Sequence, residues 1–566
     1  MTLSDNSKLR VGLLMDSLTL PAWAYEMLVT VQHSAYAEVK LIVLNDSEEP
    51  KRRSLFARVV RNWGIILYLA YCKLEDRVFA PVPNAFEPRN AAELLRDVPV
   101  IRAKPRRSKH SDRLEDDDIE KISQYHIDVF VRLGFRILRG RILQAARYGV
   151  WSYHHGDNTV NRGVPAGFWE VLEGHPVTGS ILQILTEDLD NGTVLCRSFS
   201  ATDHLSVNRN RNTYYWKSAS FLPRKLKELQ ALGREEFFRR LGSCNRLNFY
   251  SRRLYVAPRN WEFVALLSKH LVRYGKLKVR NALFPDQWVL LYDLRDGLSE
   301  SLWRFKRIVP PRDRFWADPH VVHRDGTYYI FVEEFLYRQG KARISLIEMD
   351  GKGNYTQPQP VLERPYHLSY PFVFEWNGDW YMIPETSANH TVEVYKCVAF
   401  PNRWEFCLTL MENITAVDAT PFFDGRKWWL FANVTEQPGA SICDELFLFF
   451  ADTPLSTSWT AHATNPVVSD VRSSRPAGRI FEHGGHLYRP SQNSEGEYGY
   501  GLKLNRIVTL SETEYREEEV SSIEPRWARD IRGIHTLSHA QELTVVDARL
   551  RRLAYPIRGK RYSTSS

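Results

Sequence analysis

The densest group of chemically useful side chains lies at residues 148–195. An apolar strand there ends in His154 and His155, the chain turns at Gly-Asp-Asn, and a short helix follows. Histidine exchanges protons near neutral pH, and polar groups at the carboxyl ends of strands form the sites of α/β proteins. Residues 148–195 therefore predict a polar site at the edge of a sheet.

The elements before this group indicate the sheet that must position it. The run LRVGLLM is typical of a strand, residues 21–33 of a helix and VKLIVLND of a second strand, which together open a βαβ unit. Residues 117–125 are expected to form a helix, and a further apolar strand ends at Gly134. No GxGxxG sequence follows the first strand, so a dinucleotide-binding fingerprint is absent. We expect an α/β domain with a Rossmann-like parallel sheet.

The order of motifs in this domain resembles the formyltransferase family, which includes methionyl-tRNA formyltransferase and the sugar N-formyltransferases. The family pattern is a strand ending in Asn-x-His, a loop closing on Arg-Gly, a helix, then Thr-Gly and Leu-Asp-x-Gly. Laid on this chain without a gap, the pattern places Ser152 at the Asn, His154 at the His, Arg162-Gly163 at the Arg-Gly, Thr178-Gly179 at the Thr-Gly and Asp190 in the last motif.

The resemblance covers about residues 8–200 and implies 10-formyltetrahydrofolate as the formyl donor. Ser152 departs from the family's Asn, which helps to hold the oxyanion of the tetrahedral intermediate. The family's C-terminal module for tRNA does not follow, so a tRNA acceptor is not expected.

Transfer of a formyl group to an amine needs a hydrogen-bond donor for the developing oxyanion and a base for the amine proton. His154 or His155 could supply the donor, and Asp190 could orient a histidine and set its protonation state. The alternative is structural: one histidine bonds the strand end and Asp190 caps a turn. Arg132, in an apolar strand, is either part of a structural ion pair or an anion ligand. The candidates are His154, Asp190, Ser152 and His155 for catalysis, and Asp157, Asn158 and Arg162 for substrate binding.

Composition limits the class of protein. A chain of 566 residues with 43% hydrophobic and 25% charged residues is expected to form two or more globular domains. The six cysteines are scattered without metal-ligand spacing, which favours free thiols in a reducing compartment and no metal site. The net charge of +9 comes from 76 basic and 67 acidic residues spread along the chain, so nucleic acid is not an expected partner.

The chain shows no signal-peptide pattern and no run of about 20 apolar residues, so we expect a cytoplasmic protein. Residues 51–74 join basic side chains to an apolar run. This pattern is typical of a segment on an anionic membrane surface, or of a core helix with a solvated basic flank. Peripheral membrane contact is therefore one of two interpretations of this segment.

From about residue 288 the chain repeats one plan: a polar entry, an apolar strand, a turn with glycine and an aromatic strand. Asp318, Tyr370 and Asp418 each precede an aromatic residue by ten positions. A unit that recurs at about 50 residues with NG, DG and GG hairpin signals predicts a five-bladed β-propeller. One blade is expected to be completed by a strand near residues 287–293. The copies lie at residues 315–334, 368–386, 416–434 and 475–493, with a weaker fifth at 533–548.

This half resembles the propellers of furanosidase- and xylosidase-type glycoside hydrolases, and more closely the N-terminal module of plant glucosamine inositolphosphorylceramide transferases. The closer likeness lies in PVLERPYHLSYPFVFEWNGDWYMIPETS and NPVVSDVRSSRPAGRIFEHGGHLYRPSQ. On the hydrolase pattern Asp318 matches the base and Asp418 the auxiliary acid, whereas Arg475 stands where the general-acid glutamate is expected. Hydrolysis needs two carboxylates at the glycosidic bond, and the glutamates available to replace the missing one are Glu333, Glu334 and Glu385.

Equivalent positions of successive blades converge on a propeller's axis. Asp318, Asp418 and Arg475, with His535, are therefore expected to form a polar pocket that binds a glycan, because buried charges are costly unless paired or functional. The alternative is that the aspartates cap turns at strand starts. The tryptophans of these strands are expected to fill the interfaces between blades.

These patterns give four segments: a formyltransferase-like domain at 8–200, a helical linker at 201–284, a five-bladed propeller at 285–552 and a disordered tail at 553–566. The first functional hypothesis is a formyltransferase-like transferase that acts on an amino sugar, sugar nucleotide or glycolipid precursor and binds glycan through the propeller. The second is a glycan-binding or glycan-processing protein, glycosidase-like or glycosyltransferase-like, whose formyltransferase-like domain has lost formyl transfer.

Overall fold

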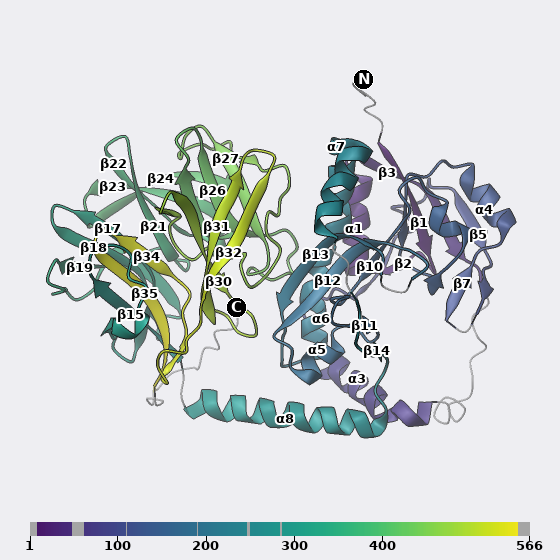
Figure 1. Ribbon diagram of the computed structural model, residues 1–566, viewed down its shortest axis with the longest axis horizontal. Coiled ribbons are helices and arrows are strands. Elements are labelled where there is room, and N and C mark those ends of the chain that lie inside the picture. The colour runs from purple at the N-terminus through teal and green to yellow at the C-terminus, as the bar shows by residue number, and fades with distance from the viewer. Residues whose placement is uncertain are drawn as a thin grey trace. The chain divides into compact units, whose positions relative to one another are not determined.

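The structure, a computed structural model, describes residues 8–47, 62–108, 110–188, 191–245, 249–283 and 286–552. The chain divides into two compact units. Unit 1 is Met1–Val272 with Gln437–Ser441, and unit 2 is Arg273–Glu436 with Ile442–Ser566. Unit 1 is α/β and unit 2 is built mostly of strands (Figure 1). The expected multidomain layout is therefore confirmed.

Unit 1 is organised around a seven-stranded sheet in the order β13-β12-β10-β8-β1-β3-β5. Strands β5, β3, β1, β8 and β10 run parallel, and β12 and β13 form an antiparallel edge. Because parallel strands end on the same side, Arg132 and His154 meet at the carboxyl edge of the sheet. The strands are β1 Leu9–Met15, β3 Ala37–Asn45, β5 Val100–Ala103, β8 Val129–Arg132, β10 Val150–His154, β12 Val177–Ile184 and β13 Thr193–Ala201.

Helices cover both faces of this sheet. Alternation along β1 sends Leu13 to one face and Leu14 to the other. Trp216 and Phe237 are buried in the core on the Leu13 face, so their helices belong to unit 1 and not to the linker expected at 201–284. The Leu13 face is covered by α1 Ala22–Gln32, α6 Val207–Ser218 and α7 Phe221–Cys244, and the Leu14 face by α4 Asp116–Ser123 and η2 Arg141–Gln144.

A second, smaller core of unit 1 joins three further helices around Phe168 and Phe263. These helices are α3 Ile66–Val78, α5 Phe168–Glu173 and α8 Asn260–Leu283, and the residues of α8 from Arg273 on belong to unit 2. Within the described ranges, no helix combines the length and apolar character needed to cross a membrane. The short elements of unit 1 are η1 Trp63–Ile65, β2 Thr19–Pro21, β4 Pro88–Asn90, β6 Arg106–Arg107, β7 Ser111–Arg113, β9 Ile137–Leu138, β11 Arg162–Gly163 and β14 Leu254–Tyr255.

Unit 2 consists of five antiparallel sheets. The first combines β15 Asp286–Leu294 and β16 Lys306–Ile308 with β33 Ile531–Gly533, β34 Leu537–Ala540 and β35 Leu543–Arg551. The second is β17 Arg314–Arg324, β18 Thr327–Leu336, β19 Lys341–Asp350 and β20 Gln359–Leu362; the third is β21 Ser369–Trp376, β22 Asp379–Glu385, β23 Thr391–Ala399 and β24 Arg403–Glu412. The fourth is β25 Thr415–Phe423, β26 Trp428–Thr435, β27 Leu446–Ala451 and β28 Thr460–Ala461; the fifth is β29 Phe481–His483, β30 His486–Asn493, β31 Gly501–Leu510 and β32 Tyr515–Ile523. Short 3-10 turns lie at η3 Leu302–Arg304 and η4 Ser387–Asn389.

Apolar clusters lie between successive sheets of unit 2. Trp316 packs between the first and second sheets, Trp380 between the second and third, and Trp428 between the third and fourth. Trp429 packs between the fourth and fifth sheets, and Leu502 between the fifth and the first. These tryptophans therefore fill the spaces between sheets, as the sequence predicted.

The entry residues of three sheets share one backbone geometry. Asp318, Tyr370 and Asp418 have φ of 50°, 42° and 52°, and each lies where pairing with the next strand is interrupted. A positive φ is uncommon for residues other than glycine. The ten-residue spacing in the sequence thus reflects a repeated backbone conformation.

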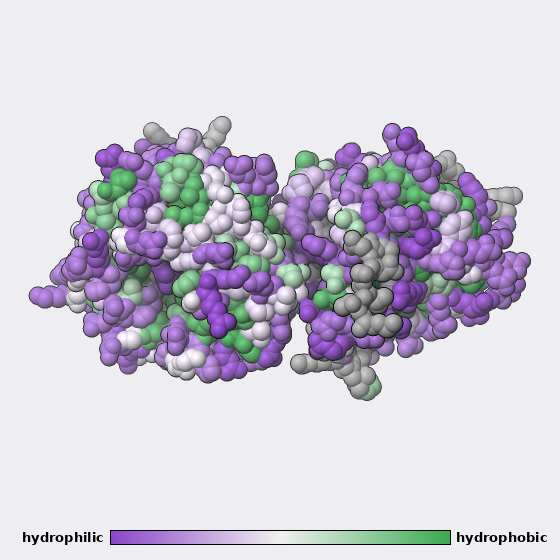
Figure 2. Space-filling model, turned by 90° about the horizontal axis from the view of Figure 1, so that it is seen from above, coloured by the Kyte–Doolittle hydropathy of each residue, from purple (hydrophilic) through white to green (hydrophobic). Residues whose placement is uncertain are grey.

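Polar residues dominate the surface that is visible in Figure 2. On this face hydrophilic residues cover most of the molecule, and hydrophobic residues gather in smaller areas. Exposed apolar residues scattered singly are normal for a folded protein and need no partner.

Gly12 tests the packing of the central strand of unit 1. A Cβ at this position would lie 2.2 Å from Cε1 of Phe130 on the adjacent β8. Gly12→Ala is expected to lower the free energy of unfolding by about 1–3 kcal/mol, because an extra carbon overpacks the sheet face. Urea denaturation measures the loss. Gly275→Ala in α8, where a Cβ meets nothing within 4 Å, is the control and should not destabilise; equal losses would contradict the packing argument.

Candidate functional site

In unit 1 the candidate residues follow the end of β10. Ser152 is buried inside the sheet, and its Oγ accepts a hydrogen bond of 3.0 Å from Nη1 of Arg132. Arg132 also donates to the carbonyl oxygen of Phe135 at 3.3 Å. Ser152 and Arg132 thus form a polar contact across the ends of β10 and β8.

The two adjacent histidines have different surroundings. The His155 ring stacks on Tyr215, with centroids 3.6 Å apart, and meets the edge of Trp23 at 5.4 Å. Burial lowers the pKa of His155 well below its usual range, so this ring stays neutral at physiological pH. Its buried Nδ1 has no hydrogen-bond partner among the described residues. His155 is therefore part of an aromatic cluster.

His154 turns instead toward the loop that follows. Its Nε2 lies 3.1 Å from the carbonyl oxygen of Asn161. Because a carbonyl only accepts hydrogen bonds, Nε2 carries the proton of the neutral ring and Nδ1 is the basic nitrogen. His154 thus contacts the loop, whereas His155 does not.

The loop between His154 and Gly163 is fixed by two arginines. Arg197 of β13 donates from Nη1 to Oδ1 of Asp157 at 2.5 Å and from Nη2 to Oδ1 of Asn158 at 2.9 Å. Arg162 donates from Nε to the Asn158 carbonyl at 3.0 Å, and its guanidinium lies over the Tyr250 ring. The predicted binding residues Asp157, Asn158 and Arg162 therefore hold the loop in place.

Two motif glycines permit close contact in this region. Gly163 has φ of 112°, and a Cβ there would lie 2.1 Å from the Tyr255 carbonyl oxygen. A Cβ on Gly179 would lie 2.8 Å from the backbone nitrogen of Asp157. Gly163 of the Arg-Gly motif thus lets the chain approach β14, and Gly179 of the Thr-Gly motif lets β12 approach the loop.

A cavity of about 240 Å³ opens beside this loop. Glu170 of α5 and Asn161 of the loop are its buried polar residues, and burial raises the pKa of Glu170. The Asn161 side chain hydrogen-bonds Glu170, and its Oδ1 has no partner among the described residues. The lining residues are Asp157, Val160, Asn161, Glu170, His175, Pro176, Val177, Gly179, Phe199 and Arg252.

The sequence analysis missed Glu170. The sequence held a signal for it, since the run FWEVL places one acid among four apolar residues, and all five are buried in α5. A lone carboxyl on an apolar helix face indicates a functional or paired group. Asp190, the predicted orienting acid, lies outside the described residues, as do residues 51–61 of the basic segment and the tail at 553–566.

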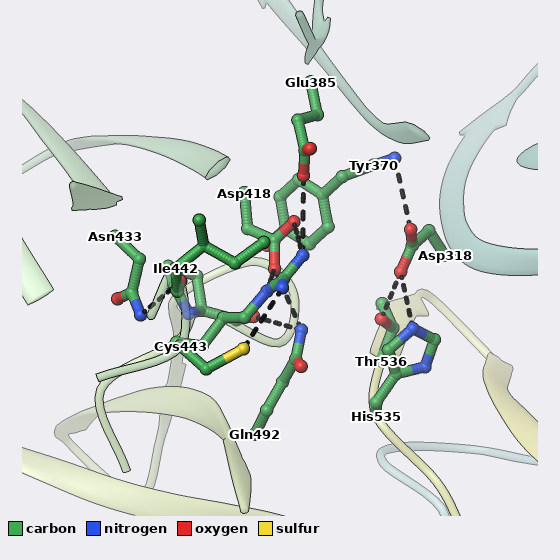
Figure 3. Close-up of polar contacts among 12 residues, drawn as sticks. Asp318, Tyr370, Glu385, Asp418, Asn433, Ile442, Cys443, Gln492, His535 and Thr536 are labelled. Atoms are coloured by element: carbon green, nitrogen blue, oxygen red, sulfur yellow. Dashed lines mark hydrogen bonds and ion pairs between the residues drawn. The ribbon is translucent and has the colours of Figure 1, made fainter. Parts of the chain in front are cut away.

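In unit 2, buried carboxylates gather where the entry residues of the sheets meet (Figure 3). Asp318 accepts hydrogen bonds from Oγ1 of Thr536 at 2.8 Å and from the backbone nitrogen of Tyr370 at 3.3 Å. Nε2 of His535 lies 3.3 Å from Oδ1 of Asp318. Asp318 is thus held by two neighbouring sheets.

Asp547 of β35 organises the same region. It accepts from the backbone nitrogens of His535, Thr536 and Asp318 at 3.0, 2.9 and 2.9 Å, and lies 2.7 Å from Nδ1 of His535. Asp318, His535 and Asp547 could supply three metal-ligand atoms within 4.8 Å of one another. Both oxygens of Asp547 are already bonded to N–H groups, however, so the donor set does not fit a metal ion.

Asp418 forms a second buried pair with Arg475. Its Oδ2 lies 2.5 Å from Nε and its Oδ1 3.2 Å from Nη2 of Arg475, and Nε2 of Gln492 donates to Oδ2 at 2.9 Å. Burial raises the pKa of Asp418 to about 6, and the Arg475 charge opposes this rise. Arg475 Nη2 lies 3.5 Å from Glu385.

Glu333 is a further buried acid near these groups. Burial, and then the charges of Asp318 and Glu385, raise its pKa well above the usual range. Nε2 of His367 lies 3.4 Å from its Oε1. Glu334, by contrast, bonds Arg314 and Arg343 in a structural ion pair.

The structure therefore brings Asp318, Asp418, Arg475 and His535 into one region; that they form a glycan-binding pocket stays a prediction. Their polar atoms bond mainly to one another and to neighbouring backbone. Asp547 was missed, although its acid within the apolar run LTVVDA was visible in the sequence.

Comparison with known proteins gives separate similarities for the two halves. Residues 309–535 match the family described as glucosamine inositolphosphorylceramide transferase 1, N-terminal. The chain is 32% identical over 209 residues to glucosamine inositolphosphorylceramide transferase 1 of Arabidopsis thaliana, which covers 36% of this chain and 27% of that protein. The chain thus spans about a quarter of the length of this relative. The likeness of the second half to this module is confirmed.

The first half has a shorter likeness. The chain is 38% identical over 82 residues to methionyl-tRNA formyltransferase of Prochlorococcus marinus, over 14% of this chain and 24% of that protein. Among solved structures, a family 117 glycoside hydrolase of Zobellia galactanivorans aligns with a TM-score of 0.32 and 12% identity, covering 48% of this chain and 91% of that chain. A structural overlap this slight carries no argument about function.

Asp547 allows the buried network to be tested. Asp547→Asn places an amide NH₂ where backbone N–H groups now donate, and we expect a loss of about 2–4 kcal/mol in unfolding free energy. Calorimetry of the thermal transition measures it. Asp379→Asn, which breaks an exposed pair with Lys396, is the control and should cost about 0–1 kcal/mol. A loss no greater than the control's would show that the network is not needed for stability.

Glu333 predicts a pH dependence of stability. Its raised pKa means that the folded protein holds the proton more tightly than the unfolded chain, so stability present at low pH is lost as the pH rises through the folded pKa. Glu333→Gln mimics the neutral acid and should match the wild type near pH 4 but be more stable at pH 8. Each kcal/mol corresponds to about 2–4 °C in melting temperature for a domain of this size. Glu375→Gln, on the exposed end of β21, is the control; parallel pH profiles for Glu333→Gln and the wild type would contradict the prediction.

Proposed function

We propose that the protein is a transferase that acylates an amino group of a sugar nucleotide or glycolipid precursor in unit 1, while unit 2 holds the glycan. One observation carries this proposal: the cavity beside the loop 155–163 holds the buried acid Glu170, whose pKa burial raises, next to Asn161, and adjoins the loop that His154 contacts. An acylation site needs such a pairing of a base with a hydrogen-bond donor.

The roles of the residues follow from their surroundings. Nδ1 of His154 takes the proton of the attacking amine. A protonated Glu170 donates a hydrogen bond, and Asn161 orients it. Asp157, held by Arg197, faces the cavity and attracts the ammonium form of an amino sugar before it loses its proton. Ser152, bonded to Arg132, has no direct part in this scheme.

The formyltransferase resemblance names 10-formyltetrahydrofolate as the donor, which would supply the formyl carbon. The cavity of about 240 Å³ lies below the range of about 300–1,000 Å³ typical of sites for drug-sized ligands. The cavity would therefore not enclose a whole folate. It suits the reacting end of an acceptor sugar together with the formyl group, whose transfer to the amine would release tetrahydrofolate.

For unit 2 we propose a closed five-bladed propeller that binds carbohydrate. The pairing of β15 with β35 and the apolar cluster between the fifth and first sheets support closure. The similarity of residues 309–535 to a glucosamine inositolphosphorylceramide transferase module supports a glycan or glycolipid as the bound group. The protein would then work in the cytoplasm or at the surface of a membrane, where such precursors are made.

A specific observation also favours the second hypothesis, glycan processing by unit 2. Glu333 is a protonated acid close to Asp318, and glycosidic cleavage needs an acid beside a carboxylate. The hydrogen bonds from Tyr370 and Thr536 to Asp318 argue against glycan cleavage by unit 2, since they engage both carboxylate oxygens of Asp318.

The decisive experiment measures acyl transfer by the full-length protein. We expect formylation of an amino-sugar nucleotide when 10-formyltetrahydrofolate is supplied, detected by mass spectrometry. His154→Ala should lower turnover by about 10²–10⁴-fold, because it removes the base. His483→Ala, an exposed histidine of β29, is the control and should leave turnover unchanged.

Two outcomes separate the hypotheses. Full turnover in His154→Ala would overturn the role of His154. No transfer by the wild type, together with cleavage of a glycan that is lost in Glu333→Gln, would overturn the transferase proposal and establish unit 2 as the catalytic unit.

A further inference from the structure

Helix α8 has an apolar face that packs and another that does not. Phe263 is buried in the small core around Phe168, and Leu266 and Leu267 pack beside it. On the other side, Trp261 is 73% exposed, and further large apolar residues are exposed along the whole helix. These are Val264, Leu271, Val272, Val279 and Leu283.

The exposed residues form one stripe. From Trp261 to Leu283 the stripe passes through Val264, Ser268, Leu271, Gly275 and Val279, each three or four positions after the one before. A helix turns once in 3.6 residues, so this spacing aligns the side chains along one face. Ser268 and Gly275 fall on the same stripe and leave it smooth.

Cations border this stripe. Lys269, Arg273, Lys276 and Arg280 fall along one edge by the same helical geometry, and Lys278 falls on the other edge. Glu262 is the single acid in the sequence of α8, and it pairs with Arg253. The exposed side of the helix is therefore apolar in the middle and positive at its borders.

A second exposed tryptophan lies near the start of α8. Nδ2 of Asn260 donates to the carbonyl oxygen of Trp63 at 2.6 Å, and Oδ1 of Asn260 accepts from the backbone nitrogen of Leu67 at 3.1 Å. Trp63 is 67% exposed. Asn260 thus ties the start of α3 to the start of α8, and both tryptophans are presented to solvent.

We propose that this face of α8, together with Trp63, docks on an anionic membrane surface. An interfacial helix buries an apolar stripe at the level of the acyl chains while flanking lysines and arginines reach the headgroups. Tryptophan is enriched at this depth. Trp63 belongs to the segment 51–74 that the sequence indicated, whereas the face of α8 is a separate surface. The inference does not depend on the reaction proposed for unit 1.

The cations that border the stripe favour an anionic membrane over a second copy of the chain as its partner. Two α8 faces packed on each other would bring lysines and arginines close to lysines and arginines, with one acid per helix to offset them. Anionic lipid supplies the complementary charge.

The test is co-sedimentation of the full-length protein with phosphatidylcholine vesicles, with and without phosphatidylserine. We expect binding to the anionic vesicles that weakens as salt increases. Lys269→Glu with Lys276→Glu should lower the partition coefficient by at least about 25-fold, since each cation near an anionic surface contributes about fivefold. Trp261→Ser with Leu271→Ser should also abolish most binding.

Matched controls lie in unit 2. Trp303 is 68% exposed and Val520 is 49% exposed, so Trp303→Ser with Val520→Ser removes similar apolar groups. Lys352→Glu with Arg426→Glu makes the same change of charge. Both controls should bind as the wild type does.

Equal binding to neutral and anionic vesicles would overturn the proposal, as would equal binding by the α8 and control variants. No vesicle binding, with a dimer in light scattering that Trp261→Ser with Leu271→Ser dissociates, would assign the face to a second copy instead. Circular dichroism confirms that each variant is folded.

Discussion

A buried carboxyl group is stable only where hydrogen-bond donors replace the water it has lost or where it keeps its proton. This constraint shapes both units. Asp547 is fully buried, and three backbone N–H groups from two sheets donate to it. The strands that carry these donors must therefore keep their positions, which fixes where β17, β35 and the segment before β34 meet.

The other buried acids of unit 2 meet the same constraint in different ways. Asp418 is bonded by Arg475 and Gln492, whereas Glu333 has neighbouring carboxylates and a raised pKa. A protonated acid needs no counter-charge, so Glu333 can lie beside Asp318. The centre of unit 2 is consequently a network of buried acids, some held by hydrogen-bond donors and one, Glu333, with a pKa raised well above its usual range.

In unit 1 the same constraint acts on an acid that lies beside a cavity. Glu170 lies on a buried helix face, where Asn161 hydrogen-bonds it, and a cavity lies beside both residues. Arg197 fixes the loop from β13, so the polar groups facing the cavity are held in place before any ligand arrives. Such preorganisation is what a transfer site requires. The two histidines are adjacent in the sequence but differ in their contacts. His154 contacts the loop, and His155 packs in an aromatic cluster.

The sequence by itself determined the local features. Apolar runs separated by turns specified the parallel strands, and the ten-residue spacing of Asp318, Tyr370 and Asp418 specified three hairpins of one geometry, because hairpins depend on neighbouring residues. The tertiary structure alone decided which polar groups became partners. The pairing of Asp418 with Arg475, the place of α6 and α7 in the core of unit 1, and the burial of Glu170 join segments far apart in the chain. Burial and pairing are sums over such distant contacts, so no local pattern contains them.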